Sequence, residues 1–181
     1  IILSFTLSVN AQGILSDKNN FNRQDTLRGS ITKERIWWDL TYYHLDITVD
    51  PEKRTIYGSN EISYDVIEPY YEMQIDLQQP LILTRAEQNG EDLEIRHDGN
   101  AHFIKLKDTQ IKGENNKIKV FYEGKPRGAV RAPWDGGISW ERDENGNHFI
   151  ASSCQGLGAS VWWPNKDHMY DEVEGMLMSV N

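Results

Sequence analysis

The side chains that could carry out chemistry are few, and most are too scattered to form a site by spacing. The five histidines are His44, His97, His102, His148 and His168. No H-x-H, H-x-x-x-H or H-E-x-x-H arrangement occurs, so no local motif supplies the three protein ligands of a catalytic zinc. We therefore expect no metal ligands in this chain, and surface or sheet positions for the histidines.

One cysteine and one acidic cluster are the other chemical candidates. Cys154 is the only cysteine, which excludes an internal disulfide and a C-x-x-C metal site; a lone cysteine is more often a small buried hydrophobe than a nucleophile. Asp171, Glu172 and Glu174 are types of residue that serve as general acid and base, but neighbouring acids are more often a solvated surface. We therefore expect no catalytic residue here.

The stretch SSCQGLGASVWWPNKDHMYDE, residues 152–172, mixes these groups with a lone glutamine and a Trp-Trp-Pro. It is too polar for an ordinary core strand and too apolar for a loose tail. Such a composition is typical of an ordered loop, so the elements before it must hold it in place.

Those elements are predicted to be short strands. Alternating apolar residues mark strand-length runs at 37–49, 54–66, 72–83, 103–107, 117–123 and 147–155. A Pro-containing turn at 50–53 joins the first two runs, and Asn89-Gly90 is a hairpin signal because both residues tolerate positive φ. Before residue 165, no segment of ten or more residues has a helical period. The pattern predicts an all-β domain, an antiparallel β-sandwich, over residues 35–181.

The segment 124–147 departs from this pattern. It is rich in glycine, proline and charge and contains Trp134 and Trp140, which predicts a long ordered loop or an irregular hairpin. Because indole rings stack on sugar faces, an autonomous β-sandwich binding module, for example one that binds glycans, is an alternative function.

Composition limits the class of protein. The chain has 181 residues, which fits one domain, with 28 Asp and Glu against 19 Lys and Arg, for a net charge of −9. Without a basic stripe the chain lacks the means to neutralise phosphates, so nucleic acid is not an expected partner.

The first residues differ from the rest. IILSFTLSVNAQG is apolar and uncharged, and Val9-Asn10-Ala11 forms a small-x-small pattern typical of the end of a secretory signal peptide; the alternative is a buried first strand. We expect residues 1–11 to be a partial signal peptide and the polar residues 12–34 to be a flexible leader. The predicted location is therefore periplasmic or extracellular. Thirteen residues are too few to span a bilayer as a helix, and no transmembrane segment is predicted elsewhere.

Taken in order, these motifs resemble the aminopeptidase N family of zinc metallopeptidases, which includes the leukotriene A hydrolases. In that family the amino-terminal β domain carries a strand with T-Q-[CF]-[EQ], matched here by SSCQ, residues 152–155. A variable loop then leads to a W-F-P-type element with an Asp three residues past the proline. Trp162, Trp163, Pro164 and Asp167 stand at those positions, and EGMLMSV matches the strand that follows.

The earlier chain agrees with this resemblance, which covers residues 37–181. YYHLDITVDPEKRTIYGSNEISY is similar to the opening strands of the family's β domain. Two residues depart from the family pattern: Ser153 stands where the family usually has Gln, and Ser160 where it often has Arg.

The resemblance implies a role for one side chain. The last residue of the T-Q-x-[EQ] element helps to hold the free α-amino group of the substrate, and Gln155 matches it. An amide oxygen accepts a hydrogen bond from an ammonium group; alternatively, Gln155 only bonds the neighbouring loop backbone. Trp162, Trp163 and Pro164 are then expected to anchor the loop by packing, and Asp167 to bracket its turn through backbone amides.

The resemblance also implies what lies elsewhere. The family's zinc, its H-E-x-x-H helix and its catalytic residues belong to a following domain, so we expect the chain to be truncated before it and inactive alone. The expected function is that of a substrate-anchoring domain in a secreted zinc aminopeptidase. Its expected partners are the amino terminus of a peptide and the missing catalytic domain of the same polypeptide.

Overall fold

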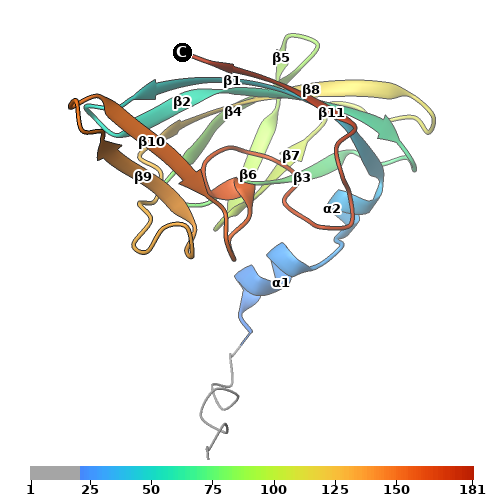
Figure 1. Ribbon diagram of the computed structural model, residues 1–181. Helices are drawn as coiled ribbons and strands as arrows, with labels where there is room; N and C mark the ends of the chain where they lie inside the picture. The colour runs from blue at the N-terminus through green and yellow to red at the C-terminus, as the bar shows by residue number, and fades with distance from the viewer. Residues whose placement is uncertain (1–20) are drawn as a thin grey trace, which may run out of the picture.

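Two stacked β-sheets form the framework of the chain in a computed structural model, which describes residues 21–181 (Figure 1). The larger sheet has six strands in the order β11-β1-β2-β8-β4-β5. Their bounds are Trp38–Asp50 (β1), Thr55–Val66 (β2), Ile82–Gln88 (β4), Glu91–Asp92 (β5), Asn115–Gly124 (β8) and Gly175–Val180 (β11). The smaller sheet has the order β3-β7-β6, with bounds Glu72–Asp76, Ala101–Lys105 and Glu94–Asp98 respectively. The predicted all-β class is confirmed.

The core lies between the two sheets because alternate residues of each strand face it. From the larger sheet, Leu45, Ile62 and Val120 are fully buried, and from the smaller sheet Met73 and Ile104 meet them in one cluster. The sandwich is therefore held by the period-two pattern that the sequence shows.

Two turns expected from the sequence form as predicted. Asn89 and Gly90 have φ of 54° and 83° and join β4 to β5, where Gln88 pairs with Glu91. β1 and β2 form an antiparallel hairpin that begins at the pair Asp50 and Thr55.

The sheets are not wholly antiparallel as predicted. β11 runs parallel to β1, with Tyr42 opposite Gly175 and Ile47 opposite Val180. The alternation of apolar residues that identifies a strand is the same in both directions, so the direction of β11 was decided by the path of the chain before it.

The run predicted as one strand at 72–83 is two strands in different sheets. β3 belongs to the smaller sheet and β4 to the larger, and residues 77–81 cross between them. Pro80 lies in this crossing; since proline has no N–H and cannot donate to a strand ladder, it is compatible with a break there.

The segment 124–147, predicted as a loop or irregular hairpin, contains β9 (Gly137–Arg142), which pairs antiparallel with β10 (His148–Ser153). This two-stranded unit is separate from both sheets. Its last strand leads directly into the loop that carries the candidate site, which includes the short 3₁₀ helix η2 (Ala159–Val161).

The prediction of a flexible leader is wrong for residues 21–34; residues 1–20, with the predicted signal peptide, lie outside the described residues. Helix α1 (Arg23–Gly29) begins at a capping box, in which the Asn22 side chain accepts from the Asp25 N–H and the Asp25 carboxylate accepts from the Asn22 N–H. Helix α2 (Lys33–Ile36) follows. Leu27 of α1 packs against Ala101 and Phe103 of β7, so the two helices lie on the smaller sheet (Figure 1). In the described part of the chain, no helix is long and apolar enough to cross a membrane.

Candidate functional site

Gln155 lies in the turn that follows β10, and its side chain is exposed. The Cys154 carbonyl accepts hydrogen bonds from the N–H groups of Leu157 (3.1 Å) and Gly158 (2.9 Å), which closes the turn around Gln155. The glutamine amide is thus presented to solvent from a defined backbone, as the predicted binding role requires.

The base of this turn is fastened to the segment that follows β3. The Gln78 backbone N–H donates to the Ser160 carbonyl over 2.8 Å. Its side-chain amide donates to the Leu157 carbonyl (2.5 Å) and to the Ser160 hydroxyl (2.9 Å). Gln78, in the segment that crosses between the two sheets, therefore holds both ends of the short segment 157–160.

Asp167 braces the same segment, at the position where the sequence predicts a bracket for the turn. Its carboxylate accepts from the N–H (3.3 Å) and the hydroxyl of Ser160. A Cβ added to Gly158 would lie 2.2 Å from that carboxylate, and Gly158 has a φ of +79°. Only glycine meets both conditions without strain.

The Trp-Trp-Pro element packs, as predicted. Trp163 is buried and meets the Tyr43 ring edge-on, with centroids 4.9 Å apart. Trp162 is partly buried, with its ring 6.1 Å from that of Trp163. Pro164 is buried, and its carbonyl accepts from the Asn60 side chain over 2.9 Å. These contacts fix the end of the loop against β1 and β2.

A buried ion pair that the sequence analysis missed supports the loop from the other side. Arg35 donates to Asp76 over 2.5 Å, and both side chains are buried. The Asp76 carboxylate also accepts from the Asp167 N–H over 3.1 Å. Burial raises the pKa of Asp76, and the Arg35 charge opposes that shift. Asp76 therefore joins α2, β3 and the loop at one point.

A second buried pair joins Lys166 to Asp171. The Lys166 ammonium donates to the Asp171 carboxylate and to the Trp38 carbonyl (2.7 Å), and lies 3.9 Å from the centroid of the Trp38 ring. Burial lowers its pKa to about 8. The expectation that the acidic cluster is solvated is therefore wrong for Asp171, although Glu172 and Glu174 are exposed.

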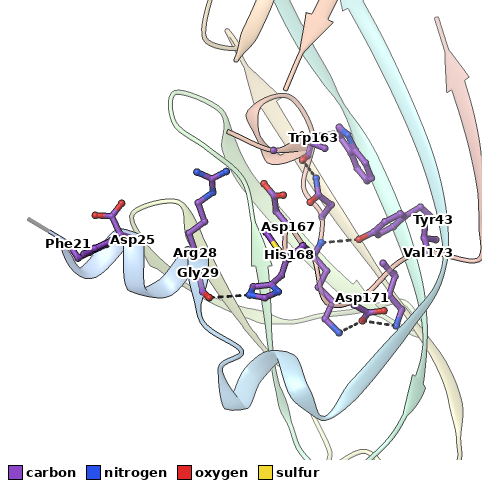
Figure 2. Close-up of a pocket in the computed structure, with 16 residues that line it drawn as sticks. Phe21, Asp25, Arg28, Gly29, Tyr43, Trp163, Asp167, His168, Asp171 and Val173 are labelled. Atoms are coloured by element: carbon purple, nitrogen blue, oxygen red, sulfur yellow. Dashed lines mark hydrogen bonds and ion pairs between the residues drawn. The ribbon is translucent and has the colours of Figure 1, made fainter. Parts of the chain in front are cut away.

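Part of this arrangement lines a cleft of about 750 Å³ between α1 and residues 163–173 (Figure 2). Trp163 and Asp167 line it together with Arg28, His168 and Met169, and His168 reaches the Gly29 carbonyl of α1 over 3.2 Å. Gln155 does not line it. The structure thus brings the supporting residues together and leaves the predicted binding residue on a separate, exposed turn.

The remaining chemical candidates fit structural roles. Burial raises the pKa of the Cys154 thiol, which disfavours the reactive thiolate. His97 and His102 face each other across β6 and β7 with their Nδ1 atoms 2.7 Å apart. Within residues 21–181 no group of three or more His, Cys, Asp or Glu side chains is arranged to hold a metal ion.

The sequence around Asp76 and Lys166 contains no feature that identifies either side chain as buried. Asp76 is the polar partner in an alternating run, a position usually assigned to solvent. Lys166 lies in a loop. Asp76 is buried against Arg35 of α2 and Asp167 of the loop. Lys166 is buried against Trp38 and Tyr43 of β1.

Comparison with known proteins gives structural relatives only. No protein-family model matches the sequence, and no curated protein matches it. The fold is similar to an M1 zinc metallopeptidase from Deinococcus radiodurans, with a TM-score of 0.60 and 20% identity over 80% of this chain and 33% of that one. A two-domain M1 zinc metallopeptidase variant bound to L-arginine gives a TM-score of 0.62 at 21% identity, over 81% of this chain and 33% of that one.

Yeast LTA4 hydrolase in complex with bestatin is also similar, with a TM-score of 0.64 at 12% identity, over 91% of this chain and 25% of that one. The chain thus spans a quarter to a third of the length of these structures. Taken together, the matches confirm at the level of fold the resemblance seen in the sequence: the chain has the fold expected of an amino-terminal domain of the M1 zinc metallopeptidase and LTA4 hydrolase family.

Proposed function

We propose that this chain is the amino-terminal substrate-anchoring domain of a secreted zinc aminopeptidase, with the catalytic zinc domain in a longer form of the polypeptide. One observation carries the proposal: an exposed glutamine stands on a turn whose base is fixed by partly buried hydrogen bonds to the side chains of Gln78 and Asp167. Side chains that bind ligands are commonly presented in this way, on a loop held by a rigid scaffold.

The chemistry of Gln155 suits an amino terminus. Its amide oxygen accepts a hydrogen bond from an ammonium group, without the charge that a carboxylate would add. Among the solved relatives, M1 metallopeptidase structures hold L-arginine, L-tryptophan or a Tyr-Ser-Ala substrate. These ligands belong to those proteins, and they support peptides as the substrate class here.

Kinetics of the longer polypeptide test the role of Gln155. Gln155→Ala should remove one hydrogen bond to a charged group, about 1–3 kcal/mol, mainly as a higher KM for substrates with a free amino terminus. Gln155→Glu should keep or improve kcat/KM because a carboxylate adds charge. The matched control is Asn145→Ala, which removes an exposed amide at the opposite end of the β9–β10 hairpin. Unchanged kcat/KM for Gln155→Ala on an aminoacyl reporter would reduce Gln155 to a structural residue.

Export is the second part of the proposal. If Val9-Asn10-Ala11 closes a signal peptide, the mature protein should begin at Gln12. Amino-terminal sequencing of protein from the periplasm or the medium tests this, and intact residues 1–11 on that protein would contradict it.

The alternative of a glycan-binding module receives less support. Of the six tryptophans, all within the described residues, only Trp134 is largely exposed, at 78%. Trp37, Trp38 and Trp163 are buried, and the other two are partly buried. A platform on which sugars stack needs exposed rings, and a single one does not make it.

A further inference from the structure

We propose that Val130 and Trp134 contact the first side chain of a peptide whose amino group Gln155 holds, and that they favour an apolar or aromatic side chain there. Both residues lie on the loop 127–136, between β8 and β9. This inference rests on the proposed function, since it takes Gln155 to bind an amino terminus. It adds two specificity-determining residues that lie outside the motif of Gln155.

The loop 127–136 lies against the turn that carries Gln155. The Ser153 hydroxyl, at the end of β10, donates to the Asp135 carbonyl. A Cβ added to Gly136 would lie 2.6 Å from the Leu157 side chain, so these two residues pack closely. The loop therefore contacts the chain both before and after Gln155, and the indole belongs to the residue immediately before Asp135.

Hydrogen bonds within the loop fix its backbone. The Asp135 carboxylate accepts from the N–H groups of Val130 (2.7 Å) and Arg131 (2.8 Å). The Trp134 N–H donates to the Arg131 carbonyl over 2.9 Å. At the base, the N–H and C=O groups of Ile138 bond to the start of the loop over 2.8 and 3.1 Å. A loop that is already ordered loses little conformational entropy when a ligand binds to it.

The two apolar side chains of this fixed loop are uncovered. Trp134 is 78% exposed and Val130 is 82% exposed. Neither side chain contributes to the core, although the backbone of both is held by hydrogen bonds. A large apolar surface on a rigid loop beside a binding residue suits contact with a ligand, because an indole offers much contact area with few rotatable bonds.

The charges around the indole favour an uncharged substrate side chain. Lys125, Arg127 and Arg131 lie in or just before the loop and are exposed. The one acid among residues 125–136 is Asp135, whose carboxylate is already bonded to loop N–H groups. A lysine or arginine at the first position of the peptide would be repelled by the three cations. An apolar or aromatic side chain would instead bury its surface against the indole.

Aminoacyl reporters with phenylalanyl, alanyl and lysyl groups test this preference in the longer polypeptide. The wild-type protein should have its highest kcat/KM on the phenylalanyl reporter. Trp134→Ala should lower that value by about tenfold or more, while kcat/KM on the alanyl reporter stays within about twofold. Trp134→Phe should keep most of the phenylalanyl preference. An unchanged ratio of phenylalanyl to alanyl kcat/KM in Trp134→Ala, or a wild-type preference for lysyl, would overturn the proposal.

Phe149→Ala is the matched control. It removes another exposed aromatic ring (58%) from the same two-stranded unit, four residues before Ser153 along β10, and should leave the ratio unchanged. Equal changes in the two variants would overturn the proposal. Thermal unfolding gives a second check, since Trp134→Ala at an exposed position should change the stability of the longer polypeptide by less than about 0.5 kcal/mol. A much larger loss would show that Trp134 packs within the protein and would overturn the proposal.

The same reporters separate this inference from the proposed function. Gln155→Ala should lower kcat/KM on the phenylalanyl and alanyl reporters alike, whereas Trp134→Ala should change their ratio. A ratio that Trp134→Ala leaves unchanged, beside a loss in Gln155→Ala, would overturn this inference and leave the proposed function in place. A wild-type polypeptide without activity on any of the reporters would overturn both.

Discussion

At the scale of single residues, the charged groups near the candidate site are structural. Arg35, Asp76, Lys166 and Asp171 are buried in pairs. Each pair neutralises itself, and the Lys166 and Arg35 side chains are inaccessible to solvent. Gln155, on the separate exposed turn, is an uncharged amide suited to hydrogen bonding rather than to proton transfer.

Removal of the Lys166 ammonium tests whether the fold depends on the ion pair that neutralises the buried Asp171 carboxylate. Lys166→Met leaves a carboxylate buried without its cation, which typically costs about 3–5 kcal/mol. The double variant Lys166→Met with Asp171→Leu should recover most of the loss, because it removes the unpaired charge. Urea unfolding of the four proteins in a double-mutant cycle gives the coupling energy. Additive losses would show that the two side chains are independent.

His102 should make the fold sensitive to acid. Burial lowers its pKa from 6.5 to about 4, so between these values the unfolded chain binds more protons than the folded chain. The free energy of unfolding should therefore fall as the pH drops from about 6.5 to 4, by up to about 3 kcal/mol. Urea unfolding at several pH values measures this. His102→Gln should flatten the curve, whereas His44→Gln, at an exposed position, should not; parallel curves for all three would contradict the assignment.

At the scale of elements, the loop 154–167 is held by parts that are distant in the sequence. Gln78 follows β3, Asn60 lies in β2 and Tyr43 in β1, whose hydroxyl accepts from the Lys166 N–H over 2.9 Å. Helix α2 adds Arg35, which donates to the Leu27, Arg28 and Ser30 carbonyls at the end of α1. The short helices thus complete the layer that encloses the loop.

Two glycines of this loop give a matched test of its packing. Gly156 and Gly158 have similar φ, +71° and +79°, but an added Cβ meets nothing within 4 Å at Gly156 and meets the Asp167 carboxylate at Gly158. Gly158→Ala should therefore destabilise the protein by more than about 1 kcal/mol, and by more than Gly156→Ala. Thermal unfolding of both variants measures the difference. Equal losses of stability in the two variants would show that the close contact between the added Cβ and Asp167 does not contribute to the destabilisation.

At the scale of the whole molecule, residues 21–181 form a two-layer sandwich whose six-stranded sheet packs on a three-stranded one. Among residues 21–181, no group of three or more His, Cys, Asp or Glu side chains is arranged to hold a metal ion. The fold supplies a hydrogen-bonded turn that presents Gln155 to solvent.

The chain by itself should bind no stoichiometric zinc and hydrolyse no aminoacyl reporter. The reason is that its histidines form no H-x-H, H-x-x-x-H or H-E-x-x-H arrangement that could supply zinc ligands. Metal analysis of purified protein after dialysis, together with a reporter assay, checks this. Tight one-to-one zinc would show that part of the catalytic site lies in this chain.

The sequence by itself determined the strands, the turns and the family resemblance. These features depend on residues that are close together in the sequence. The two-residue alternation of β1, β2 and β8 buries one face of each strand, and Asn89-Gly90 sets its own turn geometry. The choice of Gln155 as the candidate binding residue and of Trp163 as a packing residue came from the family resemblance, and the structure places Gln155 on an exposed turn and buries Trp163.

Only the tertiary structure decided which sheet each strand joined and which charges were buried. The run 72–83 divides between two sheets, and β11 lies parallel to β1, although local alternation is the same in either case. Arg35 meets Asp76 across 41 positions of sequence, and both appear polar and exposed when read in order. The burial of a side chain depends on which residues from distant parts of the chain pack over it. The local sequence pattern does not specify those residues.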